Sequence, residues 1–198
     1  DLFLGLVRAE GIVTSEAPPP LSETLTRLIT LRKTTPLSPE EEARRKGCRD
    51  FLRNGAYKPT GRGKPASEYL LHSAAGGETG QEGKEDFPRI NGPVDANNLV
   101  SLGHLVPISL WDLDLAGTDR FEFRLGREQE EYIFNPSGQV LSVKDLVVGC
   151  GLPPSPETAD SPSRPMVTPI KDSLATKTSP ATTRVAGCLA GPGGEPPA

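Results

Sequence analysis

Apolar residues recur at helical spacing in the first half of the chain, between breaks rich in proline and glycine. The run of leucine, valine and isoleucine over residues 1–14 predicts a strand. Leucine and isoleucine are spaced three or four positions apart over residues 21–31, which predicts an amphipathic helix. Ser38, Pro39 and the glutamates after them are typical of a helix start, and this second helix is expected to stop at Gly55.

Two shorter helices are predicted further along the chain. One begins at Ala66 and continues to His72, and the other spans residues 97–103. The polar, glycine-rich residues 76–84 lie between them and predict a flexible loop.

The period of the pattern changes to two after residue 109, which predicts short strands. Residues 120–125 alternate between apolar and charged side chains, so one face of this strand is apolar. The other strands are predicted over residues 132–134, 140–143, 146–148 and 183–190. Helices that come early and strands that come late predict an α+β fold, with mixed or antiparallel sheets in the C-terminal part.

We expect a single domain over residues 1–190. A length of 198 residues suits one domain, and 21 glycines and 21 prolines predict many turns. Residues 153–165 are rich in proline, serine and acidic residues and are interpreted as a flexible insertion. Residues 191–198 are expected to form a disordered tail.

Charge and cysteine content narrow the classes of function. The formal net charge of −4 does not attract nucleic acid, so any contact with RNA must come from a local basic patch. The three cysteines lie far apart without a CxxC pair, which predicts reduced thiols, no metal site and a cytoplasmic protein. The sequence has neither a cofactor motif nor a long apolar run, so we expect no cofactor and no membrane partner.

In residues 89–114, small polar residues are interspersed among apolar ones. This segment contains three asparagines, three aspartates and two prolines. Buried amides and carboxylates are destabilising unless they are hydrogen-bonded. They therefore either bind turns and loop backbones or form a polar pocket, and the sequence leaves both interpretations open.

The spacing in this segment resembles the B3/B4 domain of the phenylalanyl-tRNA synthetase beta subunit. The residues that carry the resemblance are Ile90, Asn91, Val94, Asp95, Asn98, Pro107, Asp112, Leu113 and Asp114. Upstream, residues 64–70 are similar to a basic-Pro-Ser-Ser-Glu-x-Leu element of stand-alone B3/B4 proteins. Downstream, residues 169–173 and 176–178 are similar to the closing motif of those proteins.

The resemblance implies a B3/B4-like fold and a role in tRNA editing. In that family the domain hydrolyses tyrosine wrongly esterified to the phenylalanine tRNA, in a second pocket that accepts what the first could not reject. The implied partner is tRNA or aminoacyl-tRNA. The substrate pocket implied for this chain consists of Asn97, Asn98, Ser109, Lys171 and Asp172. The anticodon-binding, OB and catalytic parts of a synthetase are absent from the sequence, so a complete synthetase is not expected.

The chain departs from the family pattern at pocket positions. Asn97 stands where the synthetase has threonine, and Ser109 stands where it has a histidine. The glutamate that reads the tyrosine hydroxyl is expected near Ala175 or Thr176, where no acidic residue occurs. These differences argue against tyrosine as the amino acid that is removed.

Basic residues are dense between positions 44 and 64, where Asp50 alone opposes them. A basic stretch of this kind with a tyrosine nearby is typical of RNA binding. The candidate RNA-binding residues are Arg49, Arg53, Lys58, Arg62 and Lys64. The alternative is a solvated helix face whose charges balance those of residues 40–42.

Three functions remain open from the sequence. The first is a freestanding aminoacyl-tRNA deacylase, an ester hydrolase in which a held water and donors for the oxyanion suffice. The second is a module that binds RNA or an amino-acid-like ligand without chemistry. The third is a small-molecule enzyme on the same scaffold, because a fold does not fix a function.

Overall fold

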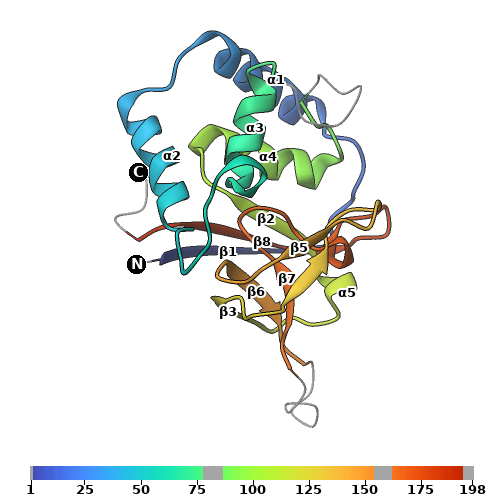
Figure 1. Ribbon diagram of the computed structural model, residues 1–198. Helices are drawn as coiled ribbons and strands as arrows, with labels where there is room; N and C mark the ends of the chain where they lie inside the picture. Colours follow the sequence, from blue (N-terminus) through green and yellow to red (C-terminus); the bar gives the residue numbers. More distant parts are fainter. Residues whose placement is uncertain (1, 78–86, 154–161, 194–198) are drawn as a thin grey trace.

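Four helices lie on one side of the molecule and the strands on the other (Figure 1). The computed structural model describes residues 2–77, 87–153 and 162–193. Its helices are α1 (Pro19–Thr34), α2 (Pro39–Asp50), α3 (Ala66–Ala74), α4 (Gly92–His104) and α5 (Leu113–Ala116), with 3-10 turns η1 (Gly61–Gly63) and η3 (Leu174–Thr176). Its strands are β1 (Leu2–Glu10), β2 (Ile108–Asp112), β3 (Phe121–Leu125), β4 (Glu131–Ile133), β5 (Val140–Ser142), β6 (Val147–Gly151), β7 (Arg164–Val167) and β8 (Arg184–Pro192). The α+β prediction is confirmed, with antiparallel sheets.

The central sheet joins the two ends of the described chain. β8 lies between β1 and β2 and pairs antiparallel with both. The predicted first strand ends at Glu10, because Gly11 turns the chain with a φ of 66°. The predicted tail begins too early, since Gly191 and Pro192 belong to β8 and pair with β1. Residues 194–198 lie outside the described residues.

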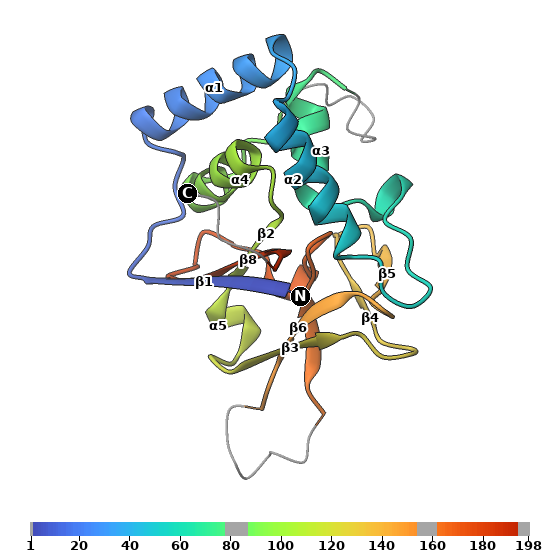
Figure 2. The ribbon, with the colours of Figure 1, turned by 90° about the vertical axis from the view of Figure 1, so that its left-hand side faces the viewer.

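Helices α1–α4 lie on one side of the central sheet, and the sheet β3-β6-β7 lies on the other (Figure 2). Trp111 of β2 is buried between the two sheets and meets Phe121 edge-on, with 5.2 Å between ring centroids. Phe123 packs against the same cluster. The alternating pattern of β3 predicts this arrangement, because residues 121 and 123 fall on one face of the strand.

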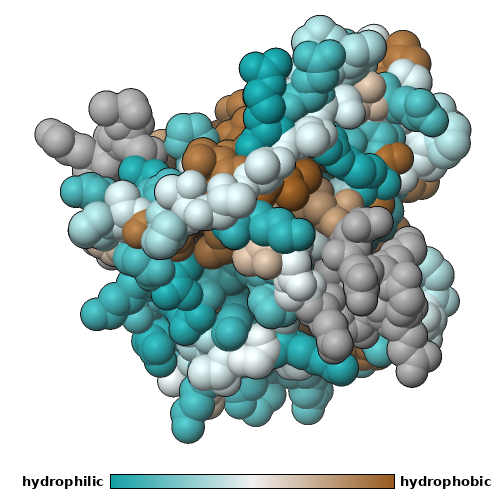
Figure 3. Space-filling model, turned by 90° about the horizontal axis from the view of Figure 1, so that it is seen from above, coloured by the Kyte–Doolittle hydropathy of each residue, from teal (hydrophilic) through white to brown (hydrophobic). Residues whose placement is uncertain are grey.

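The helical layer has an apolar cluster of its own. Leu25, Ala74 and Leu102 are buried together from α1, α3 and α4. Arg32 of α1 donates to Glu41 of α2 at 2.6 Å and to backbone carbonyls at the end of α4, which ties the three helices together. Seen from above, the surface is mostly hydrophilic, and apolar side chains show on it in patches (Figure 3).

α2 begins where the sequence predicts it and ends earlier. Ser38 and Glu41 form a capping box, with N···O distances of 3.2 and 2.9 Å. The helix ends at Asp50 because the chain then tightens, and the Leu52 N–H donates to the carbonyl of Arg49 at 3.2 Å. This tighter turn buries Leu52 in a cluster with side chains from the strand layer.

Two predicted loops fall largely outside the described residues. The predicted insertion 153–165 is too long at its C-terminal end, because β7 already begins at Arg164. Residues 154–161 of that insertion are not among the described residues, and neither are residues 78–84 of the other loop. In the ranges that are described, no helix is long and apolar enough to cross a membrane.

Candidate functional site

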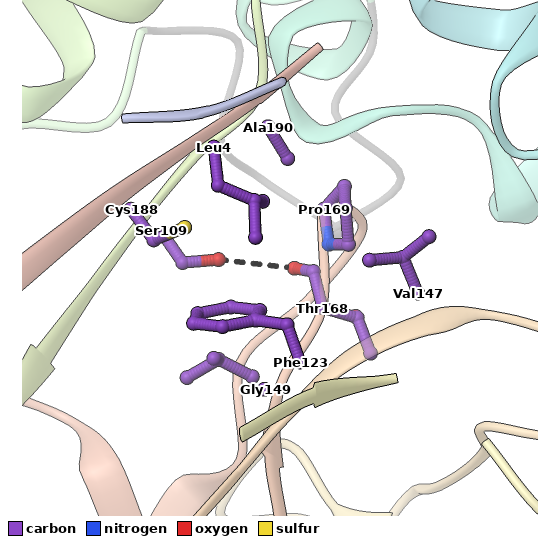
Figure 4. A pocket seen from close by; sticks show the side chains of 10 residues that line it. Leu4, Ser109, Phe123, Val147, Gly149, Thr168, Pro169, Cys188 and Ala190 are labelled. Carbon is purple, nitrogen blue, oxygen red and sulfur yellow. Dashed lines mark hydrogen bonds between the residues drawn. The ribbon is translucent and has the colours of Figure 1, made fainter. Parts of the chain in front are cut away.

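A small cavity between the two sheets measures about 10 Å³, which is room for at most one water molecule. Leu4, Phe123 and Cys188 line it around the hydroxyl of Ser109 (Figure 4). This hydroxyl donates to the carbonyl of Thr168 at 3.1 Å. The cavity is therefore a packing gap, and Ser109 ties β2 to the loop that follows β7.

Several polar residues of the segment 89–114 hold the backbone. Asn91 accepts from a backbone N–H in the first turn of α4 at 3.0 Å. Asp95 accepts from the N–H of Ile90 at 3.0 Å, and Asp112 caps α5 by accepting from two backbone N–H groups. Of the two interpretations that the sequence leaves open, the binding of turns and loops is the one observed for these three side chains.

Segments far apart in the sequence meet at the loop of residues 168–173. The N–H of Ala66, at the start of α3, donates to the loop carbonyl of Pro169 at 2.8 Å. Ser109 reaches the same loop from β2. The motif that begins at Lys64 and the motif at 169–173 are therefore in contact through backbone atoms.

The two asparagines of the predicted pocket lie on α4 and differ in their contacts. Asn97 donates through Nδ2 to the carbonyl of Ile108 at 3.1 Å, one residue before Ser109. Asn98 is buried, and its side chain makes no hydrogen bond within the described residues. Asn97 is thus linked to the 168–173 loop through β2, because it binds the carbonyl of Ile108 and the next residue, Ser109, binds the carbonyl of Thr168. No such link involves the side chain of Asn98.

Asp172 supplies the carboxylate of the predicted pocket. Its Oδ1 atom is enclosed and has no hydrogen-bond partner among the described residues. Burial raises the pKa of this carboxyl, and the charge of Lys177, the nearby hydroxyl of Ser109 and the backbone N–H groups of Thr168 and Leu110 offset only part of that rise. Buried polar atoms are hydrogen-bonded in the great majority of proteins. The Oδ1 atom is therefore a buried acceptor whose donor is not supplied by the described residues, although the carboxyl as a whole is hydrogen-bonded.

Lys171 lies beside two aromatic rings. Its Nζ atom is 4.2 Å from the ring centroid of Phe134 and 6.0 Å from that of Tyr69. Its carbonyl accepts from the hydroxyl of Tyr132 at 2.5 Å and from Thr168 Oγ1 at 2.9 Å. The backbone of the loop is fixed at this point, and the amine is held against aromatic faces.

The basic patch divides into paired and unpaired residues. Arg49 binds the buried Glu68 through both ends of its guanidinium, with Nε at 2.5 Å from Oε1, and Arg45 binds the same carboxylate at 3.1 Å. Arg53 pairs with Asp50 at 3.0 Å. Within the described residues, no ion pair involves Lys58, Arg62 or Lys64. On α2, Arg45 and Arg49 thus balance acidic residues, whereas no ion pair of the described residues involves Arg44 or Lys46 of that helix. Unpaired positive charge therefore lies both on α2 and in the loop before α3.

The sequence did not single out Tyr69, Phe134 or Lys177 as site residues. Tyr69 and Lys177 lie inside the quoted motifs, at 64–70 and 176–178, so their position was a usable signal. Phe134 directly follows β4, and nothing in its sequence context indicates the contact with Lys171.

All three cysteines are free and buried. Burial raises the pKa of Cys48 and Cys188 to about 12 and that of Cys150 to about 11, so the thiols stay protonated at neutral pH. A protonated thiol is neither a nucleophile nor a metal ligand. Across residues 2–77, 87–153 and 162–193, no group of three or more acidic, histidine or cysteine side chains is placed to hold a metal ion.

The candidate site is therefore the region around Asp172, where α3, β2 and the loop after β7 meet beside unpaired cations. Comparison of the chain with protein-family models and with curated proteins gives no match.

Proposed function

We propose that this protein binds the aminoacylated 3′ end of a tRNA and hydrolyses a wrongly attached amino acid from it. The observation that carries the proposal is the enclosed, unpartnered Oδ1 of Asp172 beside unpaired cations. An aminoacyl ester has a positively charged α-ammonium group close to the negative phosphates of the RNA. A site with one carboxylate acceptor and a basic rim complements both charges.

The reaction is ester hydrolysis. Water attacks the carbonyl carbon of the ester, the bond from that carbon to the ribose oxygen breaks, and the ribose hydroxyl takes up the proton. The ester is already activated, so a positioned water replaces a protein nucleophile. This scheme requires the 168–173 loop to move, because Oδ1 is closed to solvent in the described conformation. Asp172 then accepts hydrogen bonds from the α-ammonium group and fixes the ester against the loop.

The proposed substrate carries an amino acid other than tyrosine. Thr176 is buried, and its hydroxyl donates to the carbonyl of Ser173 at 2.8 Å. Ala175, next to it, has no polar group. Neither residue provides a carboxylate that could accept a hydrogen bond from the phenol hydroxyl of a tyrosine. A site without such an acceptor loses much of its selectivity for a hydroxyl group.

A second candidate function is binding without hydrolysis. Asn97 and Ser109 both direct their donors to backbone carbonyls, so neither is free to stabilise an oxyanion in this conformation. That observation favours a module that holds an amino-acid-like ligand through Asp172 and leaves the ester intact.

A deacylation assay on a panel of charged and mischarged tRNAs separates the two functions. We expect the protein to release at least one amino acid, and we expect Asp172→Asn to lower kcat/KM about tenfold or more, the effect of one lost charged hydrogen bond. Asp119→Asn is the matched control, because that carboxylate makes only exposed ion pairs with Arg8 and Arg184. Binding of charged tRNA without release of any amino acid would support the second function and contradict the first.

A further inference from the structure

The two edges of the central sheet differ in how their backbone groups are satisfied. At the β2 edge, the carbonyl of Ile108 accepts from the side chain of Asn97 at 3.1 Å. At the other edge, β1 lies in front of β8 in Figure 2 and pairs with no other strand of the described residues. Among those residues, no side chain hydrogen-bonds to the backbone of β1. The edge formed by β1 is therefore open.

The strand register fixes which backbone groups of β1 point outward. The N–H of Ala190 donates to the carbonyl of Pro107 at 3.2 Å, so the backbone groups of Ala190 face β2. Since this direction alternates along a strand, the odd-numbered residues of β8 face β1. Leu189 pairs with Gly5, so the odd-numbered residues of β1 face β8 and the even-numbered residues face outward. The outward-facing residues are Leu2, Leu4, Leu6, Arg8 and Glu10.

β1 lacks the features that usually protect an edge strand from pairing. It is nine residues long, contains neither lysine nor proline, and pairs with β8 without a bulge. Its one cation, Arg8, is held by Glu10 at 2.8 Å and by Asp119 at 3.0 Å. Leu6 and Val7 are 64% and 70% exposed, and neighbouring residues of a strand point to opposite faces. Both faces of β1 are therefore open at its centre, where a further strand can pair.

We infer that β1 pairs with β1 of a second copy of this chain, antiparallel and across a two-fold axis. Full overlap of residues 2–10 places this axis at Leu6, the midpoint of the strand. Leu6 then lies opposite Leu6 of the second copy. The exposed Val7 lies opposite Gly5, which has no side chain to oppose it, and no two charged residues face each other. The strand complements itself in this register, and two three-stranded sheets become one sheet of six strands.

Two variants of opposite charge test this register. In Leu6→Lys, and likewise in Leu6→Glu, like charges meet at the two-fold axis and oppose pairing. Analytical ultracentrifugation of the full chain over a range of concentrations measures the assembly. We expect the wild type to form a dimer as its concentration rises and each variant to remain a monomer over the same range. An equimolar mixture of the two variants is expected to form the dimer again, because opposite charges then face each other.

Val140→Lys is the matched control, because Val140 is 52% exposed on β5, outside the central sheet, and this variant is expected to dimerise as the wild type does. Leu6 is largely exposed, so both of its variants are expected to keep the far-UV circular dichroism spectrum of the wild type. A wild type that remains monomeric at every concentration would overturn the inference and leave the edge to a strand of another protein. A dimer that persists in both Leu6 variants, or one that the mixture of folded variants does not restore, would overturn it as well.

Discussion

Replacing Asp172 with asparagine is expected to stabilise the folded protein at neutral pH while it weakens function. In the unfolded chain an aspartate has a pKa of about 3.9. Burial raises the pKa of Asp172 in the folded protein. The folded state therefore binds this proton more tightly than the unfolded state does. Stability falls as the pH rises from about 4 through the folded pKa, and above that pKa the full penalty is present.

The size of the effect follows from the unpartnered oxygen. A buried acceptor without a donor costs about 1–3 kcal/mol, and more when it is charged. Asparagine removes the charge but keeps a polar atom at the same place, so we expect a gain of about 1 kcal/mol in the free energy of unfolding. In a chain of this size, that gain raises the Tm by roughly 2–4 °C.

Thermal melts of the wild type and the variant at pH 7 and pH 4 test this reasoning. The gain is expected at pH 7 and is expected to shrink at pH 4, where the wild-type carboxyl approaches its neutral form. Asp119→Asn, the exposed control, is expected to stay within about 0.5 kcal/mol of the wild type. A lower Tm for Asp172→Asn at pH 7 would show that both carboxylate oxygens are hydrogen-bonded in the folded protein.

Three further predictions concern other parts of the molecule. Glu68→Ala is expected to lower the unfolding free energy by about 3 kcal/mol in urea titrations, because it leaves two arginines without their buried partner, whereas Arg53→Ala is expected to change it by less than about 1 kcal/mol. Reversing Arg62 and Lys64 to glutamate is expected to weaken tRNA binding and to reduce the salt slope by about one unit for each lost phosphate contact, and an unchanged slope would place the RNA contact elsewhere. The cysteines are expected to react with a thiol reagent at pH 8 only after denaturation, because their thiols are buried and protonated, and rapid reaction of the folded protein would contradict this.

The sequence predicted the elements well where a local signal exists. The capping residues at Ser38 and the alternation in β3 each depend on neighbours in the chain, and both were found as predicted. The ends of elements were harder to predict. β8 extends to Pro192 because β1 offers it a partner along its whole length, and that partner is far away in the sequence.

The candidate site was predictable only in part, for a similar reason. Pocket positions were named from a resemblance, and the structure shows that Asn97 and Ser109 bind the backbone whereas Asp172 keeps an oxygen without a partner. Which polar residue is satisfied depends on what the fold places beside it. The basic patch shows the same limit, because Arg49 is paired by Glu68, which lies 19 residues further along the chain.

The loop of residues 168–173 contains both the stabilising and the destabilising features of the site. Its backbone is fixed by Tyr132, Ala66 and Ser109, which come from three different elements. The same loop holds an enclosed carboxylate oxygen without a donor, next to cations that repel one another. A loop that had only to close the fold would gain stability if these charges were replaced by neutral groups. Unfavourable charges held in place by several tethers are typical of a binding site, because a ligand of opposite charge relieves them on binding. Relief of these unfavourable charges therefore favours the binding of a ligand that carries an ammonium group and a phosphate.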